Sequence, residues 1–196
     1  MKKMLCVFLV CVCTLSLFSC GSATSNDKFY DENDPIKVVD CLGRQISFHE
    51  PVNTIATSQG GAVDNYFHAL KVSDRIVATN GHHSVDKLFF DPSDMPSVGK
   101  WSVDKEALAK IKPDLYIGGV NIDDLKSANK MGIKAYGMSY SSFEDITYNL
   151  ETLGVLFGVQ ERAQYVIDYL NAILELVDSR IMTVPESERL TAIMLS

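Results

Sequence analysis

The alternation of short apolar runs with amphipathic stretches constrains the fold of this chain more than any other feature. From residue 54 onward, "NTIATS", "RIVAT", "DLYIGG" and "IKAYGM" read as short buried strands, separated by stretches with helical periodicity. Strands that alternate with helices favour a mostly parallel sheet with helices on both faces. The sequence therefore predicts an α/β fold whose crossover connections are right-handed.

Local signals indicate where these elements begin and end. Pro113 blocks the continuation of the helix "SVDKEALAKI", and Gly132 stops the helix "IDDLKSANKM". Ser141 and Glu144 have the spacing of a capping box, in which each side chain binds the backbone amide of the other residue, so the next helix is expected to open there. Residues 36–48 precede the alternating region and read as a β-hairpin with a glycine in its turn.

The longest periodic segment covers residues 160–183. As a helix it rises 1.5 Å per residue and would be ~30 Å or more long. It is either the last helix of a domain or a rigid strut that joins two domains. Its apolar residues at helical spacing are Ala163, Val166, Ile167, Leu170, Ile173, Leu174, Val177 and Ile181.

The N-terminus has the pattern of a targeting segment. Two lysines precede Met4–Phe18, an uncharged apolar run that is shorter than the roughly 20 residues of a membrane-spanning helix. The run ends in Ser19-Cys20-Gly21, which is similar to the signal of bacterial lipoproteins and implies a signal peptide over residues 1–19 and lipid on Cys20. The alternative is a plain secreted protein with a cysteine there by chance. Residues 20–35 are polar and predict a flexible tether.

Charge and cysteine content exclude several classes of function. The formal net charge of −7 argues against nucleic acid as a partner. Cys41 is the single cysteine beyond Cys20, so the mature chain cannot form an intramolecular disulfide. Cys41 has no convincing histidine partner, and no nucleophile–base set stands out, so we expect no catalytic residues. The pair His82-His83 reads as part of a surface loop rather than a metal site, because zinc usually takes three or four spaced ligands.

Polar and aromatic residues follow the predicted strands, at the end of an open α/β sheet where ligands bind. Ser58 and Gln59 also lie at a helix N-terminus, whose free amides suit anionic or carbonyl groups. Trp101, the single tryptophan, either stacks on a flat ligand or fills the gap between a loop and a helix. The predicted ligand-binding residues are Ser58, Gln59, Asn80, Lys100, Trp101, Asn121 and Tyr140, and no metal ligand or cofactor is predicted.

These segments together resemble the substrate-binding lipoproteins of ABC importers for iron chelates, haem or vitamin B12. The resemblance covers about residues 36–196. "VVDCLGRQISF" is similar to the opening hairpin of that family, and Asp74-Arg75-Ile76-Val77 to the segment after its first helix. The most specific match is "PSVGKWSVDKEALAKIKPDLYIGG", with Val98-Gly99, Glu106 and Lys112-Pro113-Asp114-Leu115 in the family's order.

The resemblance implies two α/β lobes that are joined by a long rigid helix and hold the ligand between them. Residues 36–159 would be the N-terminal lobe and residues 160–183 the inter-lobe helix. Glu106 would dock onto the ABC permease, although an ordinary solvated helix carboxylate is the alternative. The protein would lie outside the cytoplasm, in the periplasm or on the outer face of the membrane, and deliver an iron-siderophore, haem or cobalamin-type ligand.

The chain departs from the family pattern at its C-terminal end. Residues 184–196 match only the beginning of a second lobe, up to its first strand. Three interpretations are open: a fragment of a longer protein, a lobe that pairs with a separate second lobe, or a genuine one-lobe protein. An alternative function is that of a one-lobe interaction lipoprotein at the cell surface, or of a fragment that no longer binds solute.

Overall fold

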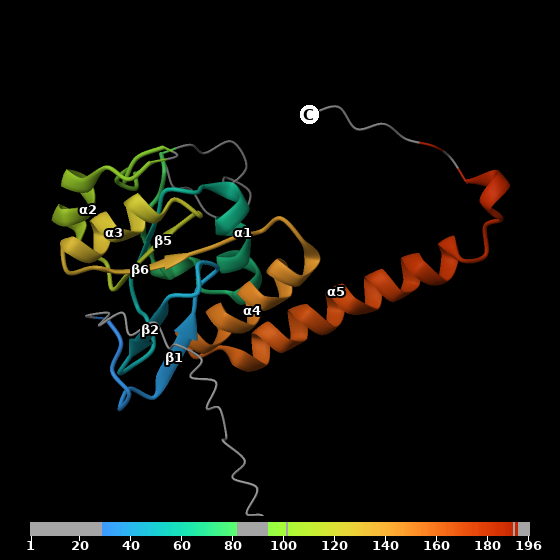
Figure 1. The fold of residues 1–196 in the computed structure, drawn as a ribbon, viewed down its shortest axis with the longest axis horizontal. Coiled ribbons are helices and arrows are strands. Elements are labelled where there is room, and N and C mark those ends of the chain that lie inside the picture. The colour runs from blue at the N-terminus through green and yellow to red at the C-terminus, as the bar shows by residue number, and fades with distance from the viewer. Residues whose placement is uncertain (1–28, 82–93, 101, 190, 192–196) are drawn as a thin grey trace, which may run out of the picture.

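The computed structural model describes residues 29–81, 94–100, 102–189 and 191 (Figure 1). Several predicted features lie outside these residues: the signal peptide, the lipid-bearing Cys20, the pair His82-His83, Trp101 and the terminal strand. The end of the predicted tether is inside them. There the amide of Ser47 donates to the carbonyl of Phe29 at 3.0 Å, and the amide of Asp31 donates to the Ser47 hydroxyl at 2.7 Å. Residues 29–31 therefore lie against the hairpin.

The lobe is built on a parallel sheet of four strands in the order β4-β3-β5-β6. The chain runs from β3 to its neighbour β4 and then crosses to β5 on the other side of β3 (Figure 1). The strand order therefore reverses between β3 and β5. The bounds of the strands are β3 Ile55–Thr57, β4 Ile76–Ala78, β5 Leu115–Gly118 and β6 Lys134–Gly137.

Helices cover both faces of this sheet. Successive side chains of a strand point to opposite faces, so the strands contribute to two separate cores. Ile55 and Tyr136 belong to a core that is shared with α1, α4 and α5. Ala56 and Tyr116 belong to a second core, shared with α2 and α3. The predicted α/β fold is confirmed. The bounds of the helices are α1 Gly61–Leu70, α2 Lys105–Ile111, α3 Ile122–Lys130, α4 Phe143–Phe157 and α5 Gln160–Ile181, with short 3-10 turns at Ser73–Arg75 and Glu186–Glu188.

The hairpin of β1 (Ile36–Val39) and β2 (Gln45–Phe48) is joined to the sheet through its turn. The buried carboxylate of Asp40 accepts hydrogen bonds from the amides of Leu42 at 3.0 Å and Arg44 at 2.9 Å, and it forms an ion pair with the Arg44 guanidinium at 2.5 Å. It also accepts from the amide of Gly137 in β6 at 3.1 Å, and Arg44 donates to the carbonyl of Ala135 at 2.7 Å. One carboxylate therefore shapes the turn and fixes the hairpin to β6.

The start of α4 differs from the prediction by one residue. Ser142, not Ser141, is the N-cap, and its hydroxyl accepts from the amide of Asp145 at 3.1 Å. The predicted capping box of Ser141 and Glu144 is wrong because the Asp145 carboxylate accepts from the Ser141 amide at 2.9 Å, which keeps Ser141 in the preceding turn.

Helices α4 and α5 cross closely near their connection. A Cβ atom placed on Gly154 of α4 would lie 2.6 Å from the Cβ of Ala163 in α5, so the crossing requires glycine. Ala163 and Ile167 are buried, and α5 then runs out of the lobe, where residues 171–181 are exposed (Figure 1). Among the described helices, none has the length and apolar character that crossing a membrane requires.

Candidate functional site

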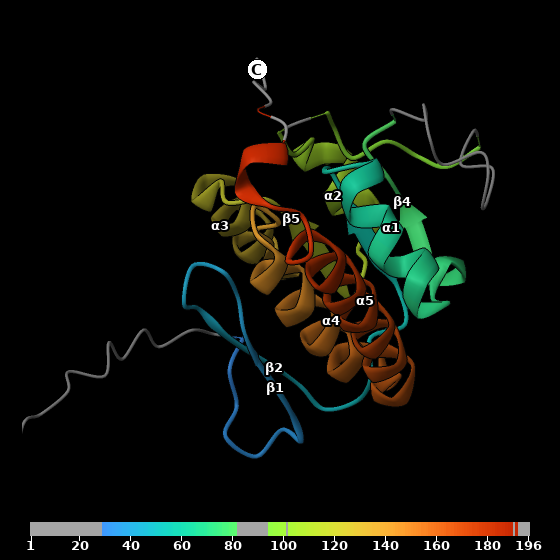
Figure 2. The same cartoon turned by 90° about the vertical axis from the view of Figure 1, so that its right-hand side faces the viewer.

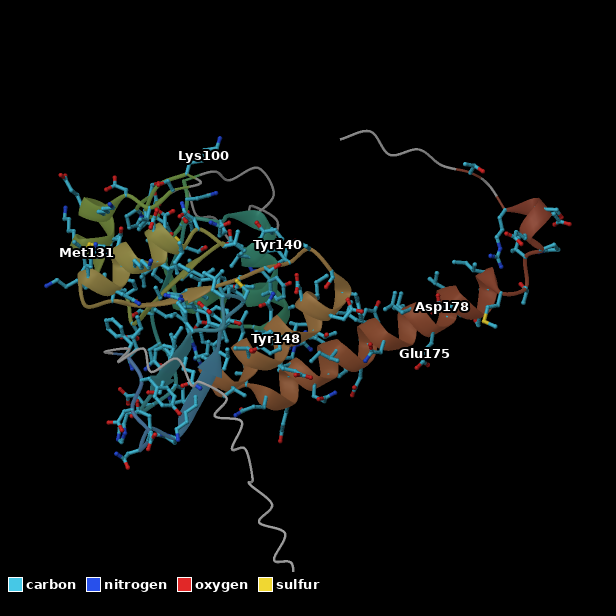
Figure 3. The ribbon with its side chains drawn as sticks, viewed as in Figure 1. Lys100, Met131, Tyr140, Tyr148, Glu175 and Asp178 are labelled. Atoms are coloured by element: carbon cyan, nitrogen blue, oxygen red, sulfur yellow. The ribbon has the colours of Figure 1, made fainter. Side chains whose placement is uncertain are left out.

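The candidate site is the edge of the sheet formed by the loops that follow β4, β3, β5 and β6, here called the rim. All four strands are parallel, so these loops gather at one end of the lobe. The rim contains the point between β3 and β5 where the strand order reverses, which is the usual ligand site in open α/β sheets. Figure 3 shows Lys100 at the upper edge of the lobe and Tyr140 closer to α4.

Gln59 and Tyr140 meet across this point. The Tyr140 hydroxyl donates to Gln59 Oε1 at 3.4 Å, a long and therefore weak bond. Both residues line a hollow of about 210 Å³ between the loops after β3, β5 and β6. Gly119 lies beneath the Gln59 amide, and a Cβ atom there would be 2.9 Å from Gln59 Oε1. The hollow thus presents an amide, a phenol and the exposed side chain of Val120 to a ligand.

Ser58 supports the rim from below. The side chain is fully buried, and its Oγ lies 2.7 Å from the hydroxyl of Tyr116 in β5. Gln59 Nε2 in turn lies 3.4 Å from Ser58 Oγ, close enough for a weak bond. Burial raises the pKa of Tyr116 to about 12, so the phenol keeps its proton at neutral pH. Ser58 therefore positions Gln59 and does not itself line the hollow.

The loop that carries Tyr140 is held by the first turns of α4. The Asp145 carboxylate accepts from the Ser139 hydroxyl at 2.6 Å as well as from the Ser141 amide, and these bonds lower the pKa of Asp145. The side-chain amide of Asn149 donates through Nδ2 to the Ser139 carbonyl at 2.7 Å. The backbone on both sides of Tyr140 is therefore fixed, while the Tyr140 side chain is 40% exposed and available to a ligand.

The other predicted residues that the structure describes do not line the hollow. Asn121 caps α3, and its side chain accepts from the amide of Asp123 at 3.1 Å. Asn80 follows β4 and is buried against Gly60, where a Cβ atom would be 2.3 Å from Asn80 Nδ2. Lys100 is exposed beyond β4. The structure thus brings Gln59 and Tyr140 together and leaves Asn80, Lys100 and Asn121 outside the hollow.

Glu106 lies apart from the hollow, in the first turn of α2, and is exposed. The helix begins at Asp104, whose carboxylate accepts from the amides of Glu106 and Ala107, both at 3.0 Å. The Glu106 carboxylate thus lies exposed at the capped start of a helix.

The predicted ligand-binding residues leave out Gly119 and Val120, which line the hollow, and Asp145, which holds the loop after β6. The glycine pair Gly118-Gly119 directly after a predicted strand indicates a place where another part of the chain or a ligand comes close to the backbone. Asp145 gave no such signal, because its partners are defined only once the loop after β6 has folded. Within the described parts of the chain, no group of three histidine, cysteine, aspartate or glutamate residues is arranged to hold a metal ion.

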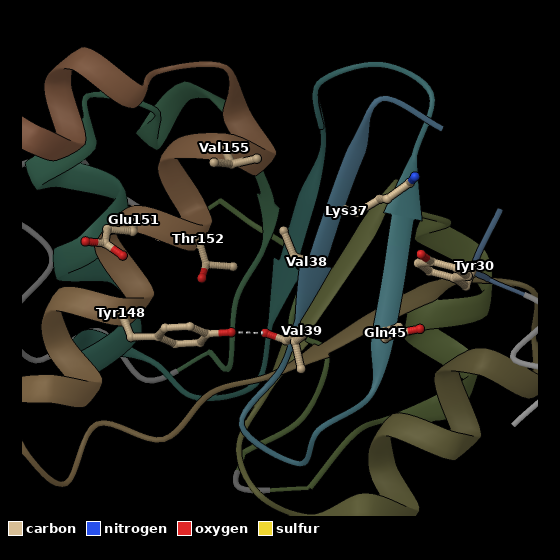
Figure 4. Close-up of a pocket in the computed structure, with 9 residues that line it drawn as sticks. All are labelled: Tyr30, Lys37, Val38, Val39, Gln45, Tyr148, Glu151, Thr152 and Val155. Carbon is tan, nitrogen blue, oxygen red and sulfur yellow. Dashed lines mark hydrogen bonds between the residues drawn. The ribbon is translucent and has the colours of Figure 1, made fainter. Parts of the chain in front are cut away.

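A second hollow of about 350 Å³ lies between the hairpin and α4 (Figure 4). Lys37 and Gln45 line it from the hairpin, and Tyr148 and Glu151 line it from α4. The Tyr148 hydroxyl donates to the carbonyl of Val39 at 2.7 Å and so occupies an outward-facing carbonyl on the edge of β1. The hollow thus lies at the seam between the hairpin and α4, and none of the predicted ligand-binding residues that the structure describes lines it.

Comparisons with known proteins bear on the fold. The family described as "Periplasmic binding protein" matches residues 58–195. No curated protein sequence matches the chain. A periplasmic solute binding protein from Veillonella parvula DSM 2008 superposes with a TM-score of 0.66 at 22% identity, covering 76% of this chain and 49% of that one. The chain therefore spans about half the length of this neighbour.

Two further solved structures have known ligands. The siderophore-binding protein BauB, bound to two acinetobactin molecules and ferric iron, gives a TM-score of 0.66 at 18% identity, over 78% of this chain and 56% of its own. The molybdate-binding protein MolA of a Haemophilus influenzae ABC transporter gives a TM-score of 0.69 at 16% identity, also over 78% and 56%. At such identities these neighbours establish the fold alone. With the family match over most of its length, the chain belongs to the periplasmic binding protein family.

Proposed function

We propose that this chain is the N-terminal lobe of an extracytoplasmic solute-binding lipoprotein that captures an iron-siderophore, haem or cobalamin-type ligand and delivers it to an ABC permease. The observation that carries the proposal is the hollow at the strand reversal, where Gln59 and Tyr140 face a ligand from two different loops. Ser58 and Asn121 position the loops. Lys100 and Trp101 extend the contact surface, while the buried Asn80 supports the loop after β4. The protein acts by binding, outside the cytoplasm, with lipid on Cys20 as its membrane anchor.

The ligand-binding role is tested by titrating the mature chain with a ferric hydroxamate, a ferric catecholate, haemin and cobalamin, and following the fluorescence of Trp101. We expect one of these chelates to quench the fluorescence, and Gln59→Ala to weaken its binding about tenfold, since a hydrogen bond to a buried ligand contributes about 1 kcal/mol or more. Gln45→Ala is the matched control, because Gln45 is exposed on the hairpin away from the rim. If the Gln59 and Gln45 variants bind the chelate with equal affinity, Gln59 is not part of the binding site.

The permease-docking role of Glu106 is a separate part of the proposal. An exposed carboxylate at a helix start suits a basic pocket on a partner. Charges at the periphery of a protein–protein interface act strongly on the rate of association. We expect Glu106→Lys to abolish binding to permease-containing membranes, while Asp123→Lys, in the first turn of α3, retains it. Solute titration by Trp101 fluorescence should be unchanged in both variants. Docking that survives the charge reversal at Glu106 would refute this assignment.

We also propose that α5 is the inter-lobe helix and that a second α/β lobe packs on its outer part. The proposal is supported by the length of the neighbour from Veillonella parvula, of which this chain covers 49%. It is further supported by a row of apolar side chains on the protruding part of α5, here called the α5 stripe, which consists of Ile173, Leu174, Val177 and Ile181, all about 40 to 50% exposed. An apolar row of this kind at the surface marks an interaction site.

A further inference from the structure

An apolar groove opens where α5 leaves the lobe. Figure 2 looks along α5 and shows α4 on one side of it and α1 on the other. Ala69 of α1, Leu150 of α4 and Val166 and Leu170 of α5 line the groove, which has a volume of about 370 Å³. It lies closer to the lobe than the α5 stripe does, because Val166 and Leu170 precede the stripe in α5.

The groove adjoins the hollow at the rim, and one side chain lines both. Tyr140 lines both the groove and the hollow that it shares with Gln59. The Tyr140 ring therefore stands between a small polar space and a larger apolar space. Among the described residues its hydroxyl is held by the weak 3.4 Å bond to Gln59, whereas the backbone on either side of it is fixed through Asp145. The Tyr140 side chain is thus less restrained than the loop that carries it.

We propose that the groove is a second ligand subsite, which takes an aromatic or branched apolar arm of a solute whose polar, metal-bearing part lies at the rim. The inference rests on the proposed solute-binding function and deepens it. It assigns the ligand to the class of chelates with organic arms rather than to bare oxyanions.

The size and chemistry of the groove support this occupant. An apolar cavity of about 150 Å³ takes a benzene ring, so a groove of about 370 Å³ has room for one or two rings. Small-molecule sites are mostly apolar, with a few polar groups that fix orientation. Here Asn65 at the wall and the Tyr140 hydroxyl supply those groups. A bare oxyanion would gain little from these mostly apolar walls, since it binds through several hydrogen-bond donors at once.

The test uses two neutral ferric complexes that share a core and differ only in their arms, ferric tris(benzohydroxamate) and ferric tris(acetohydroxamate), each in excess hydroxamic acid. Binding is followed by Trp101 fluorescence. We expect the phenyl complex to bind at least about tenfold more tightly than the methyl complex to the unmodified mature chain.

Ala69→Phe fills the groove and should abolish that preference. Asn65→Phe places the same ring at an exposed position of the groove wall and should reduce the preference for the phenyl complex. It controls for a folding defect in Ala69→Phe, because Asn65 is exposed. Ala172→Phe adds the same ring on the exposed part of α5 and should leave the preference intact.

A second probe separates failure of the subsite from failure of the proposed function. N-phenyl-1-naphthylamine, a neutral aromatic dye, should bind the unmodified chain and lose at least about tenfold in affinity in Ala69→Phe. A phenyl preference that persists in both groove variants would overturn the subsite and leave solute binding intact. Dye binding that is unchanged by Ala69→Phe but lost in Val177→Glu would place the apolar site on the α5 stripe and overturn the subsite as well. Dye binding in the groove without any response to a chelate would show an apolar site unconnected to solute binding, which also contradicts the proposal.

Discussion

Asp40→Ala is expected to lower the free energy of unfolding by about 3–5 kcal/mol, because it leaves the Arg44 guanidinium partly buried without its carboxylate. The Asp40 carboxylate also accepts from the amides of Leu42 and Gly137, and the buried Gly137 amide would be left without its partner. A domain is stable by only about 5–15 kcal/mol, so the variant should be near the limit of folding. Urea unfolding followed by circular dichroism measures the loss, and hydrogen exchange shows whether residues 36–48 open first.

Asp178→Ala is the matched control for this prediction. Asp178 is exposed on the outer part of α5, where a substitution is expected to change stability by no more than about 0.5 kcal/mol. A double-mutant cycle between Asp40 and Arg44 should yield a coupling energy above about 1.5 kcal/mol, since the pair is close and the carboxylate is buried. A loss below about 1 kcal/mol for Asp40→Ala would mean that the hairpin is held by apolar packing instead.

Gly154→Val is expected to lower stability by about 3 kcal/mol and to displace α5. Even a single Cβ atom at residue 154 would lie 2.6 Å from the Ala163 Cβ, far inside the usual carbon contact of about 3.5–4.0 Å. Both atoms are attached directly to helix backbones, so rotamer changes cannot relieve the clash and the helices must separate. Urea unfolding measures the loss, and hydrogen exchange in residues 160–170 should rise because the start of α5 lies in the same interface.

Exchanging Gly154 and Ala163 tests whether the steric clash causes the loss of stability. Gly154→Ala alone should destabilise the lobe less than valine does, and adding Ala163→Gly should recover most of that loss because one methyl group again occupies the crossing. The added glycine retains a helix-propensity cost of up to about 1 kcal/mol. Additive losses in the double variant would contradict a steric origin.

The fold was predictable because its main signal is local. Strand runs such as "DLYIGG" and the uninterrupted periodicity of residues 160–183 need no tertiary information, and β5 and α5 occur where these patterns indicate. The capping residue of α4 was not predictable with the same accuracy, because both Ser141 and Ser142 fit the pattern. The choice between them depends on the Asp145 carboxylate, which binds the Ser141 amide.

The site was predictable in position but not in detail. The rule that ligands bind after parallel strands selects Ser58 and Gln59 together, yet it cannot say that Ser58 faces inward. Its inward position follows from the Tyr116 hydroxyl, which is supplied by β5 from 58 residues away. Likewise, Gln59 and Tyr140 meet only because β3 and β6 flank β5, a neighbour relation that no local pattern contains.

The attachment of the hairpin to β6 has a consequence for the folding rate. The bonds of Asp40 to Gly137 and of Arg44 to Ala135 join residues that are 97 and 91 positions apart in the chain. Closing so long a loop is entropically costly, and proteins rich in such distant contacts fold slowly. The first structured segment of the chain must therefore wait for one of the last strands before it can dock. Until then the apolar side chains of the hairpin and the surfaces they will cover remain exposed, and this interval is when the lobe is most open to aggregation and to capture by chaperones.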